Sequence, residues 1–167
     1  MSRIAFDQLP DSSRLWIFAA DRVLAPAEQA RLNETVEAGL AAWSAHGSPV
    51  RWGYRLMHDQ FLAIGVDETH TALSGCSIDN AVRRIRALED ELGLSFLDNA
   101  RVFYREGEDV RQADRPGFRA LAEAGKVTAD TVVFNTVIAT VGEFRAGRWE
   151  VPARDSWHAQ AFPVAGR

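Results

Sequence analysis

Stretches of apolar residues and alternating apolar and polar residues divide the first part of the chain into predicted elements. The short apolar run at 15–19 predicts a buried strand. Apolar residues at helical spacing predict a helix that begins at Pro26 and stops near Gly47. The alternation at 50–56 and the apolar run at 61–66 predict two strands joined as a hairpin.

The clearest helical pattern lies in the middle of the chain. Apolar residues from Ile78 to Leu92 form one stripe, with Ser77 suited to the N-cap and Gly93 suited to the position after the last turn. A strand at 100–104 follows. The order β-α-β-β-α-β predicts an α+β, ferredoxin-like fold: a four-stranded antiparallel sheet with both helices on one face.

The second part of the chain is expected to be an extension of this core. We assign residues 1–109 to the ferredoxin-like core, with 1–13 as a loose lead-in, and 110–167 to a C-terminal α/β extension. With no long linker between them, the extension is expected to pack on the core rather than fold as an independent domain. Its predicted elements are a short helix capped by Asp114 and ended by Gly125, a strand at 131–134 that continues over 136–141, and an extended segment at 149–152.

Composition narrows the class of protein. The 167 residues are 47% hydrophobic and 25% charged, which is sufficient for a core without disulfides. The net charge of −4 gives no reason to expect DNA binding. No apolar run reaches the ~20 residues that cross a bilayer, and the start has no apolar export signal. Together with the single cysteine, this favours the cytoplasm and argues against a membrane partner.

The single cysteine lies in the most chemically suggestive segment, Ser74-Gly75-Cys76-Ser77-Ile78-Asp79. Directly before a helix, the positive end of the helix dipole favours a thiolate at Cys76. Backbone N–H groups after Gly75 could hold an anion, which makes Ser74, Gly75 and Ser77 candidates for ligand binding. The alternative is that the segment is structural, with Cys76 a small buried hydrophobic residue.

A nucleophilic cysteine needs a base and a group that orients the base. His158 is the candidate base, and Asp155 or Asp79 the candidate orienting group. The alternative is that Trp157 anchors the C-terminal tail while His158 lies at its rim. Three other histidines have no metal-ligand spacing, so neither a metal site nor a cofactor is expected: they are His46, His58 and His70.

Several segments resemble an uncharacterised family of short bacterial proteins. The resemblance extends from about Arg14 to Phe162 and is carried by the segments 14–17, 43–47, 74–79, 133–135, 149–152 and 155–158. Some family members are labelled "ABC transporter ATPase", a label that this sequence does not support because it lacks the Gly-x-x-x-x-Gly-Lys-Ser/Thr loop. We include His46, Asn135 and Trp157, which lie in these segments, among the candidate ligand-binding residues.

Three functional hypotheses follow. The first is a small enzyme or ligand-binding protein centred on Cys76, acting by thiol-dependent hydrolysis or group transfer on a small molecule. The second is a non-catalytic interaction or regulatory module in which 74–79 is structural. The third, which the acidic balance disfavours, is single-stranded RNA binding by aromatic residues on the sheet, namely Trp16, Trp52, Tyr54 and Phe61. A homo-oligomer is compatible with all three.

Overall fold

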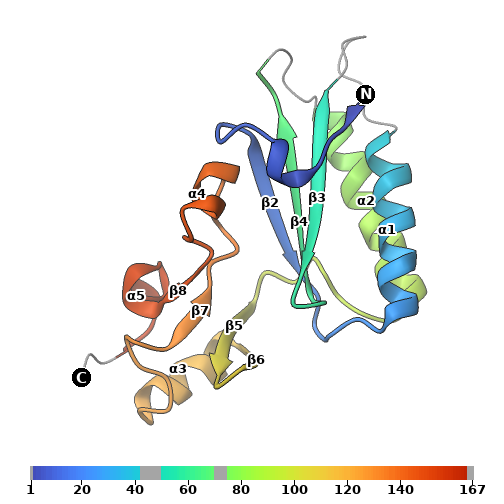
Figure 1. Ribbon diagram of the computed structural model, residues 1–167. Coiled ribbons are helices and arrows are strands. Elements are labelled where there is room, and N and C mark those ends of the chain that lie inside the picture. The colour runs from blue at the N-terminus through green and yellow to red at the C-terminus, as the bar shows by residue number, and fades with distance from the viewer. Residues whose placement is uncertain (1, 42–49, 70–74, 165–167) are drawn as a thin grey trace.

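The computed structural model describes residues 2–41, 50–69 and 75–164, which form two sheets and, within these ranges, five α-helices. The first sheet has the order β1-β3-β4-β2, and two helices lie beside it (Figure 1). Its strands are antiparallel except for the two-residue pairing of β1 with β3. The bounds are β1 Ser2–Arg3, β2 Arg14–Ala19, β3 Arg51–Met57, β4 Phe61–Asp67, α1 Pro26–Ala41 and α2 Gly75–Leu92.

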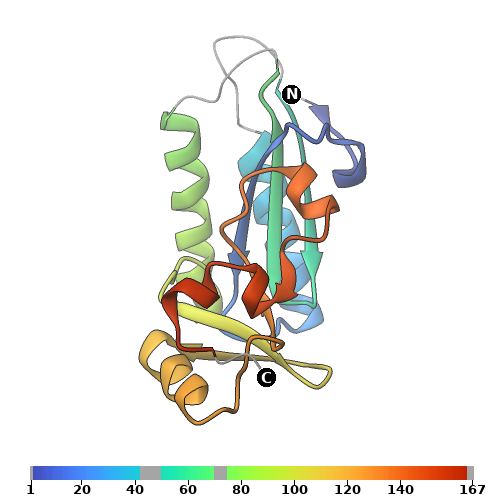
Figure 2. The same cartoon turned by 90° about the vertical axis from the view of Figure 1, so that its left-hand side faces the viewer.

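The second sheet, with the order β6-β5-β7-β8, is antiparallel throughout. Figure 2 shows this half at the lower end of the molecule, in front of the first sheet. Its helices are short, and one of them begins with the predicted cap: Asp114 accepts a hydrogen bond from the Gly117 N–H at 2.7 Å. The bounds are β5 Arg101–Glu106, β6 Asp109–Asp114, α3 Arg115–Glu123, β7 Val132–Phe134, α4 Val141–Arg145, β8 Glu150–Pro152 and α5 His158–Ala161.

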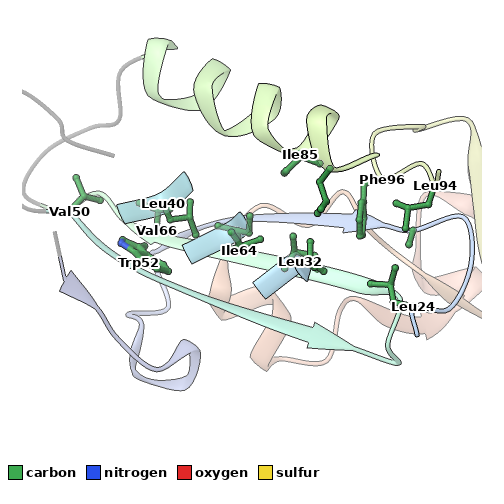
Figure 3. Packing of buried hydrophobic residues seen from close by; sticks show 14 residues of the cluster. Leu24, Leu32, Leu40, Val50, Trp52, Ile64, Val66, Ile85, Leu94 and Phe96 are labelled. Atoms are coloured by element: carbon green, nitrogen blue, oxygen red, sulfur yellow. The ribbon is translucent and has the colours of Figure 1, made fainter. Parts of the chain in front are cut away.

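The expected hairpin and the two long helices are confirmed. β3 and β4 pair in register with Tyr54 opposite Ile64, and their chain reversal lies at His58 and Asp59. Both helices cover one face of the first sheet, where their apolar stripes meet the strand residues (Figure 3). α2 begins at Gly75, so Ser77 lies inside its first turn rather than at the N-cap. The expected end of the first helix near Gly47 lies outside the described residues.

The opposite face of the first sheet is covered by the second half of the chain. A buried cluster joins Phe61 and Ala63 of β4 to Phe103, Phe134 and Trp149 of the second half. Phe61 packs between these partners, with its ring centroid 4.7 Å from that of Phe134 and 5.5 Å from that of Trp149. The C-terminal half therefore packs on the first sheet. Both faces of that sheet are buried.

The ferredoxin-like sheet is not formed as predicted. Strands β3, β4 and β2 have the neighbours expected in such a sheet, but β5, the expected fourth strand, pairs with β6 and β7 in the second sheet. The strand β6, which the sequence analysis did not predict, offers β5 a tight hairpin at Gly107, whose φ of +63° suits glycine. The structural division therefore falls before β5 rather than at residues 109 and 110.

Two further predictions need correction. The predicted loose lead-in, 1–13, is not loose over its described residues, because Phe6 and Leu9 are 5% and 1% exposed and belong to the cluster under the first sheet. The segment 136–141 does not continue β7 as a strand of the second sheet. It crosses instead to β2, where Arg14 and Thr140 form an isolated bridge, and the chain then enters α4. Of the helices in the described ranges, none combines the length and the apolarity that crossing a membrane requires.

Candidate functional site

Cys76 and His158 lie on elements at opposite ends of the molecule. α2, which contains Cys76 in its first turn, runs 18 residues, or roughly 27 Å, toward the second half. Its last residue lies beside the loop that contacts that half: the Arg22 side chain donates to the carbonyl of Leu92 at 3.2 Å, and Gln112 of β6 donates to the carbonyl of the neighbouring Asp21. The start of α2 points away from α5 in both views (Figures 1 and 2). The fold therefore does not bring the start of α2 and the start of α5 together, as the predicted pairing of Cys76 with His158 requires.

The environment of His158 is apolar rather than catalytic. The residue is 1% exposed, and its Nδ1 lies 2.8 Å from the hydroxyl of Ser156. Burial, reinforced by the charge of Arg115, lowers the pKa of His158 to about 4. Asp155, one of the two candidate orienting residues, is exposed and lies 3.9 Å from the side chain of Arg154. The partner of the imidazole is therefore a serine, and the ring is neutral at pH 7.

The remaining predicted residues do not gather around Cys76. Asp79 is exposed on α2, and Asn135 uses its side-chain oxygen to accept from the Val137 N–H at 3.4 Å. Gly75 is the first residue of α2. Ser74 and His46 lie outside the described residues. Trp157 alone among the described candidates for ligand binding lines a large pocket.

That pocket is a groove of about 530 Å³ between the free edge of β2 and the second half of the chain. One wall is β2 itself, the second is the crossing segment 136–139, and the third is the stretch from Phe96 to Phe103. Arg115 and Trp157 complete the lining. The volume falls within the range of about 300–1,000 Å³ that is typical of ligand sites.

The groove exists because two neighbouring strands separate. Tyr104 of β5 pairs with Val133 of β7, and continued antiparallel pairing would put Arg101 opposite Thr136. The chain leaves β5 after Phe134 instead and crosses to β2. Arg101 and Thr136 consequently lie on different walls of the groove.

β2 presents main-chain groups to this groove. The Leu15 N–H donates to the carbonyl of Ala139 at 2.8 Å, on the side away from β4, whereas the Ala20 N–H donates to Gln60 on the β4 side. Because the amides of a strand alternate in direction, those of Ile17 and Ala19 point the same way as that of Leu15. Segment 139–141 thus covers the beginning of the β2 edge, and the Asp21 N–H, just beyond its end, donates to the carbonyl of Ser95 at 2.9 Å; the stretch between them faces the groove.

The charged residues of the groove are mostly basic, although the chain as a whole has a net charge of −4. Arg14, Arg101 and Arg115 line it, with Asp98 as the single carboxylate among the lining residues. Asp98 lies 3.2 Å from Arg101, and Arg14 lies 4.0 Å from Glu68. Arg115 lies over the ring of Trp157 at 5.3 Å.

A second polar cluster, which the sequence analysis missed, joins the two halves. His58 of the β3–β4 turn lies 3.2 Å from Glu150 of β8 and 3.3 Å from Arg105 of β5, and Arg105 pairs with Glu150. Burial opposes ionisation of Glu150, but hydrogen bonds from Arg105 and His58 outweigh it and lower its pKa. His58 and Asp59 have φ of +49° and +50°, which are uncommon for residues other than glycine. Nothing in the spacing of these residues marks them as neighbours.

Neither the RNA hypothesis nor a metal site gains support from this geometry. Trp52 and Phe61 are 3% and 0% exposed, because helices cover one face of the sheet and the second half covers the other. Base stacking requires exposed rings. In the described part of the chain, no three His, Cys, Asp or Glu side chains converge as metal ligands would.

Comparison of the chain with protein-family models finds no match. Comparisons with curated proteins and with solved structures likewise find none. The resemblance to the family of short bacterial proteins therefore stays a prediction.

Proposed function

We propose that this protein is a non-catalytic binding module whose groove takes up a short, extended peptide segment as an added strand beside β2. The observation that carries the proposal is the free edge of β2. The amides of Ile17 and Ala19 point into a groove of about 530 Å³ rather than toward β4. Added strands of this kind derive affinity from main-chain hydrogen bonds and specificity from pockets for alternate side chains.

The length of the free edge limits the occupant. Segment 139–141 already covers the start of β2, which leaves about four residues of the strand, or roughly 13 Å, for a partner. Val137, which is 66% exposed on the groove, offers an apolar contact beside the edge. A stretch of a few residues with at least one apolar side chain fits these dimensions.

The enzyme hypothesis receives no comparable support. It required a base near Cys76, but α5, which begins with His158, lies far from the start of α2 (Figure 1), and the imidazole of His158 has Ser156 as its partner. The second hypothesis, in which the segment from Ser74 to Asp79 is structural, agrees with the position of residues 75–79 at the start of α2. We therefore assign the function to the groove and treat the start of α2 as part of the scaffold.

Amide hydrogen exchange tests the proposal directly. We expect a millimolar pool of random hexapeptides, acetylated and amidated at their ends, to slow exchange at Ile17 and Ala19 in ¹H–¹⁵N spectra. The amide of Phe18 points to β4 and should change little. A19P removes the outward N–H and should weaken binding, while A19S keeps the amide and serves as the matched control.

The outcome that contradicts the proposal is equally direct. If the pool leaves exchange at both outward amides unchanged, β2 does not receive an added strand. If the pool binds but A19P and A19S bind it equally, side chains rather than the strand edge hold the peptide.

A further inference from the structure

We propose that the peptide carries an anionic side chain and that Arg115, stacked on Trp157, is the residue that recognises it. This inference rests on the proposed peptide-binding function and specifies the chemistry of the partner. It follows from the contacts of three arginines in one groove, of which only Arg115 has no carboxylate partner in the described ranges.

The contacts of the other two arginines show why they differ from Arg115. Arg101 pairs with Asp98 at 3.2 Å and lies 3.4 Å from the side-chain oxygen of Gln112. Arg14 lies 4.0 Å from Glu68 and 4.7 Å from the ring centre of Trp16. Both guanidinium groups therefore have partners within the chain.

Arg115 has the opposite arrangement. Its guanidinium lies 5.3 Å from the centre of the Trp157 ring, and no ion pair joins it to a carboxylate of the described residues. The neighbouring carboxylate of Asp114 caps α3 by accepting from Gly117. Stacking on an indole orients the planar guanidinium while its N–H groups stay available, which suits recognition of carboxylate or phosphate.

A purely structural arginine in the same region has different contacts. Arg119, one turn further along α3, lies over Phe162 at 5.8 Å and donates to the carbonyl of Ala161 at 3.0 Å. That arginine fastens the C-terminal tail and does not line the groove. Arg115 lines the groove, and Arg101 lines it nearby. The two are close because Arg101 of β5 lies opposite Asp114 of β6 in the strand register, and Arg115 directly follows Asp114.

The electrostatic setting supports an anionic partner over a cationic or neutral one. The lining residues include three arginines and one aspartate, in a chain whose net charge is −4. A groove with the opposite sign to the rest of the surface attracts anionic segments and disfavours basic ones.

The test compares peptide pools that differ at one fixed position. In each acetylated and amidated hexapeptide pool, one position is fixed as Glu, Gln, Lys or phosphoserine, and the other positions are random. The fixed position is moved along the peptide from pool to pool. Binding is followed by the shift of the Trp157 indole N–H signal in ¹H–¹⁵N spectra. We expect at least one Glu pool to bind up to about fivefold more tightly than its Gln pool at 50 mM salt. The difference should shrink at 300 mM salt, and a stronger phosphoserine pool would identify phosphate as the anion.

Two variants assign the preference to a residue. R115Q should abolish the difference between Glu and Gln pools while Gln pools still bind. R111Q is the matched control, because Arg111 lies on β6, pairs with Glu106 and Asp109, and does not line the groove. Equal binding of Glu and Gln pools by the unaltered protein, or an unchanged preference in R115Q, would overturn the inference alone. Failure of every pool to bind would overturn the proposed function as well.

Discussion

The imidazole of His158 stacks on the indole of Trp157, with their ring centroids 3.9 Å apart and their planes inclined by 27°. His158 is buried, and it is neutral at pH 7 because burial and the charge of Arg115 lower its pKa to about 4. The tryptophan that lines the groove is therefore backed by an uncharged ring. This places a proton-sensitive group directly behind the binding surface.

Stability should consequently fall as the pH is lowered from about 6.5 to about 4. In this interval the unfolded chain binds a proton at residue 158 that the folded chain excludes, so acid favours unfolding. A pKa lowered from 6.5 to about 4 corresponds to roughly 3 kcal/mol. Urea unfolding at a series of pH values measures the effect. H158F should reduce the dependence relative to the unaltered protein. An unchanged slope in H158F would show that another group is responsible.

Glu150 should contribute to the attachment of the two halves. Its carboxylate bonds both His58 of the first half and Arg105 of the second, and its side chain is 26% exposed. We expect E150Q to lower the free energy of unfolding by about 1–3 kcal/mol, because a partly buried charged hydrogen bond is lost. E106Q is the control, since Glu106 is 69% exposed and should change stability by less than about 0.5 kcal/mol. Equal effects of the two substitutions in urea unfolding would contradict this role.

The reactivity of Cys76 should not depend on His158. The cysteine lies in the first turn of α2, and the histidine lies in the second half of the chain with Ser156 as its partner. We therefore expect the pH profile of iodoacetamide alkylation to be the same in the unaltered protein and in H158F. A shift of that profile toward higher pH in H158F would show that the two residues are coupled after all.

Two glycines should respond in opposite ways to substitution by alanine. A Cβ at Gly53 of β3 would lie 2.8 Å from the carbonyl oxygen of Ile4 and 3.1 Å from the backbone of Phe6. G53A should therefore destabilise the protein by about 1–3 kcal/mol, because backbone has to shift. At Gly39 of α1 the nearest atom belongs to the flexible side chain of Arg84, so G39A should be neutral or stabilising by up to about 1 kcal/mol. Thermal unfolding of both variants measures these changes in stability. A neutral G53A would contradict the close packing of residues 4–6 against β3.

Local sequence patterns predicted where helices and strands lie better than they predicted which strands pair with one another. The alternation in β3 and the stripe in α2 reflect burial on one face, so periodicity identifies them. The pairing of β5 was predicted wrongly, because the order of elements does not specify which edge a strand joins. β6 was missed because its residues are half-buried or exposed and carry no apolar alternation.

The candidate site was predictable only in part. Trp157 was singled out from the sequence and lines the groove. Arg115, between the cap Asp114 and Pro116, has the local sequence of an ordinary helix start. That no carboxylate of the described residues pairs with it depends on the fold. The cluster of His58, Arg105 and Glu150 joins residues up to 92 positions apart, so it can be recognised only once the fold is known.

The hydrogen bond from Leu15 to Ala139 also bears on aggregation. An open strand edge is a template on which copies of a protein assemble into fibres. Here the edge of β2 lies in a groove, with segment 136–139 on one side and the stretch from Phe96 to Phe103 on the other, so it is less open to a whole sheet than to a single strand. The same walls that admit a single chain therefore protect the protein from stacking with its own copies.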